Sequence, residues 1–146
     1  MSEVRASRHL WRSVGALLAG FVAGALLSVG TDEVLHLTHF FPPWGDPVGD
    51  GPLAAATAYR IVYGVLASYI IARLAPYSPM GHALVGGVAG LVVSTAGAVA
   101  TWNAGPAYAN HWYPVALIIT ALPCAWLGGK LRLMQLRAPA ARNMAV

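Results

Sequence analysis

Residues 74–129 read LAPYSPMGHALVGGVAGLVVSTAGAVATWNAGPAYANHWYPVALIITALPCAWLGG and include no Asp, Glu, Lys or Arg. As a single helix these 56 residues would extend about 84 Å, far more than the bilayer hydrocarbon thickness of about 30 Å. The stretch must therefore break, and it contains a group of turn-forming residues: Asn103, Gly105, Pro106 and Asn110. We expect two membrane-spanning helices, at about 80–101 and 113–133.

Two further apolar segments precede this stretch. Residues 13–31 are uncharged, which is long enough for a first span at about 13–37. A loop rich in Pro and Gly follows it, and a second span is expected at about 53–74. The expected fold is all-α: a polytopic membrane protein with a four-transmembrane-helix bundle. It would form one domain over residues 1–146, ending in a short basic cytoplasmic tail at 134–146.

The composition excludes several classes of protein. Of the 146 residues, 58% are hydrophobic and 10% are charged, against about 25% charged in an average soluble domain. The single cysteine, Cys124, excludes an internal disulfide and a cysteine-based zinc cluster. The sequence holds no phosphate-binding, dinucleotide-binding or nucleophile-elbow motif, so we do not expect an enzyme. No basic stripe with interleaved aromatic residues points to nucleic acid.

The basic residues predict the orientation. Nearly all of them fall on one side of the expected topology: Arg5, Arg8, Arg12, Arg73, Lys130, Arg132, Arg137 and Arg142. The two long loops, at 39–52 and 102–112, contain no Lys or Arg. The positive-inside rule then places both termini in the cytoplasm, in a bacterial-type inner membrane. A cleaved signal peptide is the alternative for the basic N-terminus, but the length of the first apolar segment favours an uncleaved helix.

The first and third predicted spans share a sequence pattern at an offset of 66 residues. Small residues recur at every fourth position, which forms one ridge along a helix. The ridge residues are Gly20, Gly24 and Ser28 in the first span and Gly86, Gly90 and Ser94 in the third. The repeat predicts two similar helical hairpins. We expect the two ridges to pack the first span against the third; an oligomer contact or a groove left open are the alternatives.

A cluster of ionisable residues is predicted at the outer end of the first two spans. Asp32, Glu33 and His36 lie within about one turn of each other. Arg60 is the one basic residue placed inside the apolar part of a span on the outer side, where an unpaired charge is costly. We therefore expect an ion pair of Arg60 with Asp32 or Glu33. This cluster could lock the hairpins together or bind a solute or ion.

A metal site is a third possibility for the same region. Histidine and carboxylate side chains suit zinc, copper or iron, and the candidate ligands are His36, His39 and His111. Their spacing matches no metal motif, and we expect no cofactor.

Two functions are compatible with these sequence features. The first is a non-enzymatic accessory subunit or homo-oligomeric membrane component, whose partners are membrane lipids and further copies or subunits of a larger membrane complex. The second is a small solute or ion transporter or channel with an outward-facing polar cluster. A transporter predicts a water-filled path between the spans, with Ser28 and Ser94 facing it. A packing subunit predicts no cavity there.

Overall fold

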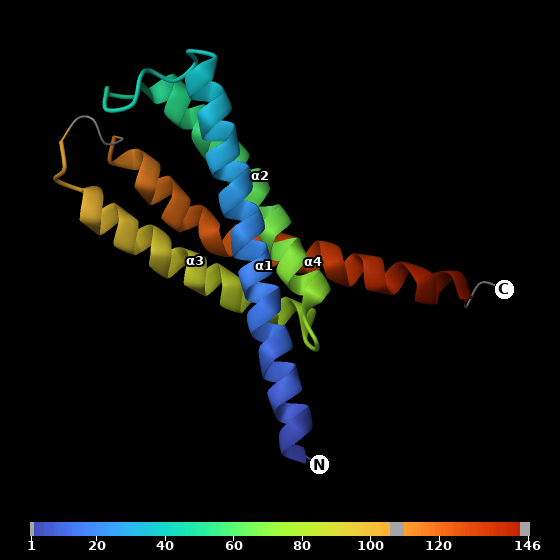
Figure 1. Ribbon diagram of the computed structural model, residues 1–146. Coiled ribbons are helices and arrows are strands. Elements are labelled where there is room, and N and C mark those ends of the chain that lie inside the picture. The colour runs from blue at the N-terminus through green and yellow to red at the C-terminus, as the bar shows by residue number, and fades with distance from the viewer. Residues whose placement is uncertain (1, 106–109, 144–146) are drawn as a thin grey trace.

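The computed structural model describes residues 2–105 and 110–143 and is all-helical over them, with no strands (Figure 1). Four helices make up most of the described residues. They are α1 (Ser2–Leu37), α2 (Asp50–Leu74), α3 (Pro79–Thr101) and α4 (Trp112–Asn143). Each contains a segment long and apolar enough to cross a membrane: His9–Leu37, Asp50–Leu74, Pro79–Thr101 and Trp112–Ala138. The prediction of four long apolar helices is confirmed.

The helix ends follow local sequence chemistry. The loop after α1 includes His39, whose φ of 59° leaves the helical region, and Phe41 is buried and anchors the loop. The turn after α2 ends at Ser78, which has a φ of 39°, and α3 then starts with Pro79 in its first turn. Proline is favoured there because its missing N–H has no partner in a first turn.

Two helices are longer than the predicted spans. α1 begins at Ser2 rather than near residue 13, and α4 continues to Asn143. Residues 134–143, which we expected in a separate tail, therefore extend α4, since Leu, Met, Gln, Arg and Ala are strong helix formers. The rest of that expected tail and the predicted breaker Pro106 lie outside the described residues.

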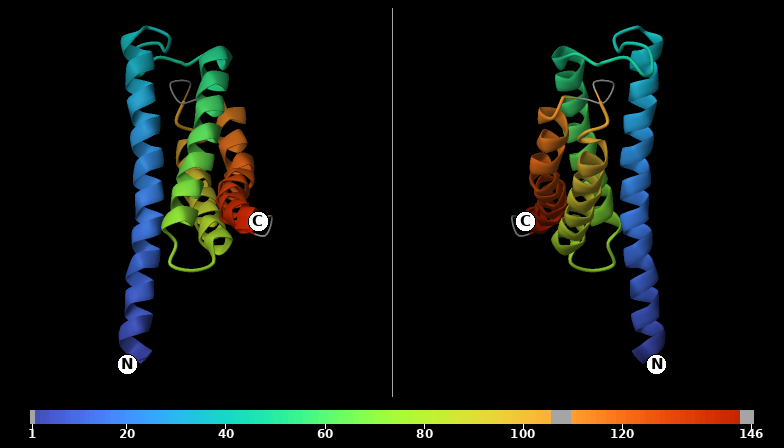
Figure 2. Two further views of the ribbon diagram at one scale, coloured as in Figure 1. Left: turned by 90° about the vertical axis from the view of Figure 1, so that its right-hand side faces the viewer. Right: turned by 90° about the vertical axis from the view of Figure 1, so that its left-hand side faces the viewer.

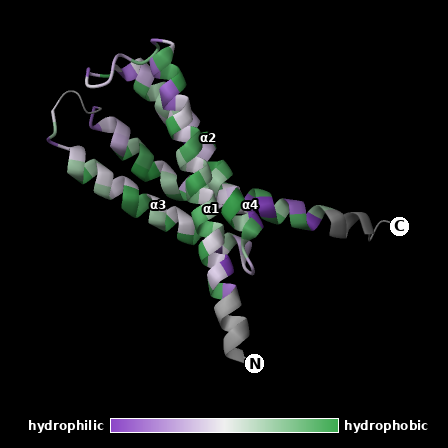
Figure 3. Ribbon diagram, viewed as in Figure 1, coloured by the Kyte–Doolittle hydropathy of each residue, from purple (hydrophilic) through white to green (hydrophobic). Residues whose placement is uncertain are grey.

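The helix α2 is the centre of the bundle. It packs against α1, α3 and α4, whereas α1 and α3 make only a slight contact. Figure 2 shows α1 standing to one side of the other three helices. Hydrophobic residues cover the middle of the helices, and hydrophilic ones gather toward the ends of α1 and α4 (Figure 3). The end where α1 stops and α2 starts is called the outer end below.

The small-residue ridges do not pack against each other as expected. A methyl group built on Gly86 would lie 2.6 Å from Ile71 Cδ1, and one on Gly20 would collide with Ile71 and lie 2.7 Å from the Ala67 carbonyl oxygen. The buried Ile71 side chain of α2 therefore fills the space between the two glycines. Gly20 and Gly86 therefore pack on Ile71 and not on each other, and the direct contact between α1 and α3 is slight.

Candidate functional site

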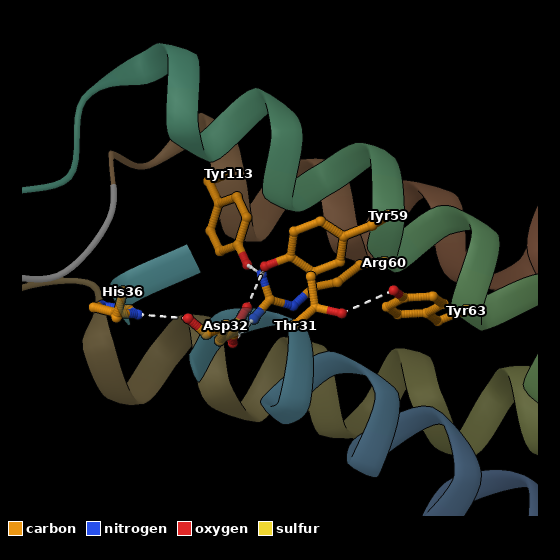
Figure 4. A network of polar contacts seen from close by, with 7 residues as sticks. All are labelled: Thr31, Asp32, His36, Tyr59, Arg60, Tyr63 and Tyr113. Atoms are coloured by element: carbon orange, nitrogen blue, oxygen red, sulfur yellow. Dashed lines mark hydrogen bonds and ion pairs between the residues drawn. The ribbon is translucent and has the colours of Figure 1, made fainter. Parts of the chain in front are cut away.

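An ion pair joins α1 to α2 near the outer end of the bundle (Figure 4). Arg60 Nη2 lies 2.5 Å from Asp32 Oδ2. The Tyr59 hydroxyl donates a hydrogen bond to the other carboxylate oxygen, Asp32 Oδ1. Arg60 Nη1 donates to the Tyr113 hydroxyl, which brings α4 into the same arrangement. These four side chains, Asp32, Tyr59, Arg60 and Tyr113, are called the polar network below.

The polar network is half-buried and its formal charges cancel. The side chains of Arg60 and Asp32 are 24% and 17% exposed. The guanidinium carbon lies 5.3 Å from the centroid of the Tyr59 ring and 5.7 Å from that of Tyr113, so both rings attract the cation. The carboxylate and the two phenols together offset the cost of placing an Arg on an apolar helix.

Two other predicted members of the cluster have different surroundings. Glu33 is exposed, and within the described residues the one ion pair is that of Arg60 with Asp32. His36 Nδ1 lies 2.8 Å from the backbone oxygen of Asp32, and its ring stacks on Trp44 with 3.8 Å between centroids. His36 therefore holds the outer loop rather than binding the carboxylate.

The three candidate metal ligands do not come together. His111 stacks on Trp102 at 4.2 Å between centroids, and its Nε2 lies 2.9 Å from the Trp102 backbone oxygen. His36 is engaged with Trp44, and His39 is exposed after the end of α1. Over residues 2–105 and 110–143, no group of three His, Cys, Asp or Glu side chains is close enough to hold a metal ion.

A groove of about 370 Å³ lies between the helices, on the inner side of the polar network. All four helices contribute to its walls. All six predicted ridge residues line it, and four of them lie away from Ile71: Gly24, Ser28, Gly90 and Ser94. The groove exists because α1 and α3 diverge beyond Ile71, and their small side chains do not fill the space. Arg60 and Tyr63 line it too.

A second, smaller pocket of about 170 Å³ lies under the outer loop. Asp32, Tyr113, Phe41 and Trp44 line it together with Arg60. Arg60 thus belongs to the walls of both cavities. The polar network therefore separates the outer pocket from the groove.

One member of the site was not found by sequence reasoning. Tyr113 is 53 residues from Arg60 along the chain, and only the packing of α4 on α2 brings them together. Tyr59, the chain neighbour of Arg60, joins the network through Asp32, whereas the Tyr63 hydroxyl lies 2.8 Å from Thr31 Oγ1. The sequence does place Tyr113 at the outer end of the fourth span. Its position there does not indicate which other helix it contacts.

No known protein family, curated protein or solved structure matches this chain. What the site can do chemically therefore follows from its geometry.

Proposed function

We propose that this chain is a small multi-pass protein of a bacterial-type inner membrane, with both termini in the cytoplasm, and that it binds a small solute in the groove. Its role is non-enzymatic, in the class of transporters and channels. The four apolar helices and the basic residues at one side of the topology support the membrane assignment. The shared pattern of Gly20–Ser28 and Gly86–Ser94 supports two similar hairpins.

One observation carries the proposed binding function. Ser28, Ser94 and Arg60, which are distant in the chain, line the same cavity of about 370 Å³. Cavities that hold small molecules have volumes of roughly 300–1,000 Å³ and combine apolar walls with a few polar groups. A subunit that acts only by packing needs no such space, and ionisable residues within spans generally mark a pathway or binding site.

Cysteine reactivity tests this proposal. In a Cys124→Ala background, Ser28→Cys and Ser94→Cys would be reacted with N-ethylmaleimide in lipid nanodiscs. Val29→Cys and Val92→Cys are the matched controls, because the native residues are 59% and 58% exposed on the outside of the helices. We expect the serine positions to react at least about tenfold faster, since a thiolate forms only where water or polar groups stabilise charge. Equal, slow reaction at all four positions, together with no bound solute in native mass spectrometry, would contradict a solute-binding groove.

A second candidate function is a homo-oligomeric or accessory membrane subunit. A methyl group built on Gly90 or Gly97 of α3 would meet nothing within 4 Å, so this face has room for a closely packed helix. Native mass spectrometry from mild detergent tests this function. A defined dimer or higher oligomer would favour it, and a monomer over a range of concentrations would argue against it.

A further inference from the structure

We propose that the groove holds the hydrocarbon chain of a single-chain amphiphile whose polar head is uncharged, with the head beside Arg60. The molecule enters sideways from the bilayer, through the gap between α1 and α3. This inference rests on the proposed function, because it names the class of solute that the same groove takes.

The groove is closed at both ends and open along one side, between α1 and α3, and this side is the access route. Towards the outer end the polar network stands between the groove and the outer pocket. At the other end Ile71 fills the space between the glycines of α1 and α3. Between these limits α1 and α3 make only a slight contact. Phe21 and Val93 line the groove and are 38% and 66% exposed, so its open side faces outward from the bundle, where lipid would lie.

The interior of the groove suits a hydrocarbon chain. No Asp, Glu or Lys lines it, and glycine and alanine make up much of its wall. A methyl group added at Gly90 would meet nothing within 4 Å, so space remains next to the backbone of α3. In lipid, filling such a space gains dispersion contacts that the bare walls lack.

At the outer end of the groove, the paired charge of Arg60 favours an uncharged head group over a charged one. The positive charge of Arg60 is balanced by Asp32, which lies outside the groove. A cationic head would be repelled by the guanidinium. An anionic head would compete with Asp32 and leave that carboxylate half-buried without its partner, which is costly. An uncharged head meets neither penalty.

The guanidinium retains hydrogen-bonding capacity for such a head. A guanidinium has five N–H donors, and the contacts of Arg60 with Asp32, Tyr59 and Tyr113 are three hydrogen bonds. An alcohol, ester or amide oxygen can accept one of the others. Further along the walls, the Thr120 hydroxyl donates to its own helix. The hydroxyls of Ser28 and Ser94 make no hydrogen bond within the described part of the chain, so they too are available to a ligand.

Three probes with the same twelve-carbon chain separate the head-group classes: dodecanol, dodecyl sulfate and dodecyltrimethylammonium. Each would be added at low mole fraction to nanodiscs that hold Ser94→Cys in the Cys124→Ala background. We expect dodecanol to slow the reaction with N-ethylmaleimide by about tenfold near saturation, and the two charged probes to slow it far less. Val92→Cys reports the effect of each probe on the bilayer itself.

Native mass spectrometry of the chain carrying only Cys124→Ala provides a second readout that needs no reactive thiol. Dodecanol adducts are expected, and Gly90→Leu, which projects into the groove, should remove them, whereas Val92→Leu should not. Equal or stronger binding of a charged probe overturns the inference. Reactive thiols without protection or adducts also overturn it, but leave a solute groove in place. Unreactive thiols together with no adduct reject the proposed function as well.

Discussion

Arg60 on α2 and Asp32 on α1 form an ion pair, with 2.5 Å between Nη2 and Oδ2. These residues are 28 positions apart in the chain, and their pairing fixes how the first two helices meet at the outer end. The contact also decides where the groove stops, because Arg60 is part of the walls of both cavities.

Replacing Arg60 by Leu, with Asp32 and Glu33 unchanged, should destabilise the protein. Asp32 would lose its charged partner in a half-buried position, and removal of one partner of a buried pair costs about 3–5 kcal/mol. Partial exposure reduces this, so we expect roughly 1–3 kcal/mol. Thermal unfolding in mild detergent measures the change. Glu33→Gln is the control and should have little effect, and the double variant Asp32→Leu/Arg60→Leu should recover part of the loss. Unchanged stability of Arg60→Leu would contradict a structural pair.

Gly128→Ala should be far more damaging than Gly90→Ala. A methyl group on Gly128 would lie 2.5 Å from the Val65 oxygen and 2.6 Å from the Tyr69 nitrogen, both backbone atoms of α2. Such atoms move only if the helices separate, so we expect a loss of at least about 2 kcal/mol. Gly90 has open space around it, and alanine there favours the helix by up to about 1 kcal/mol. Comparable melting temperatures for the two variants would contradict the close α2–α4 approach.

Ile71→Ala should leave a cavity between α1 and α3 and destabilise the protein. The Ile71 side chain is 3% exposed and separates the glycines of these helices. Its truncation leaves a cavity, and such substitutions in protein cores cost about 2–5 kcal/mol. Val92→Ala, on the outer surface of α3, is the matched control and should change stability by less than about 0.5 kcal/mol. If Ile71→Ala lowered stability as little as Val92→Ala does, the position of α1 would depend on contacts other than Ile71.

The sequence was sufficient to predict the helices but not their neighbours. The long interval without charge between Arg73 and Lys130 required two spans, and the structure has α3 and α4 there. The spacing of Gly20 and Gly86 predicted ridges, yet both meet Ile71. A period of four residues shows which side chains share a helix face. It does not show which helix that face meets, because small residues accept many partners in lipid.

The candidate site was predictable where charge constrained it. Arg60 needed an acid, and only Asp32 and Glu33 were near on the expected helices. The choice between them depended on the rotation of α1, which directs Asp32 inward and leaves Glu33 exposed. Tyr113 is neutral and lies on another helix, so no rule of charge balance required it. Cavities also depend on how helices diverge, which no single segment specifies.

Asp50→Ala should loosen the start of α4. Asp50 Oδ1 accepts hydrogen bonds from Asn110 Nδ2 at 2.7 Å and from Trp112 Nε1 at 2.8 Å, so it ties the start of α2 to the start of α4. Loss of these exposed contacts should let the first turn of α4 open more often. Amide hydrogen exchange in the first turn of α4 should accelerate roughly fivefold. Asp46→Ala, in the outer loop before α2, is the control, and equal exchange in the two variants would show that Asp50 does not hold the start of α4.

Both ends of the chain should lie on the cytoplasmic side. An even number of spans and the clustering of Lys and Arg predict this orientation. Green fluorescent protein fused to either end should be fluorescent, because it folds in the cytoplasm. Cysteine in place of Asp46 should react with an impermeant maleimide added to intact cells, in the Cys124→Ala background. Alkaline phosphatase activity from a C-terminal fusion would contradict the proposed topology.

The attachment of α1 mainly to α2 has a consequence for biogenesis. Asp32 and Arg60 both belong to the first hairpin, so this hairpin has its complete ion pair before α3 has been synthesised. We expect Arg60 to enter the bilayer beside its acid when the first hairpin inserts as a unit. Tyr113 joins later, when the second hairpin docks and its phenol reaches the guanidinium. The order of the residues along the chain therefore places both charges of the pair in the first hairpin, and the second hairpin adds an uncharged phenol.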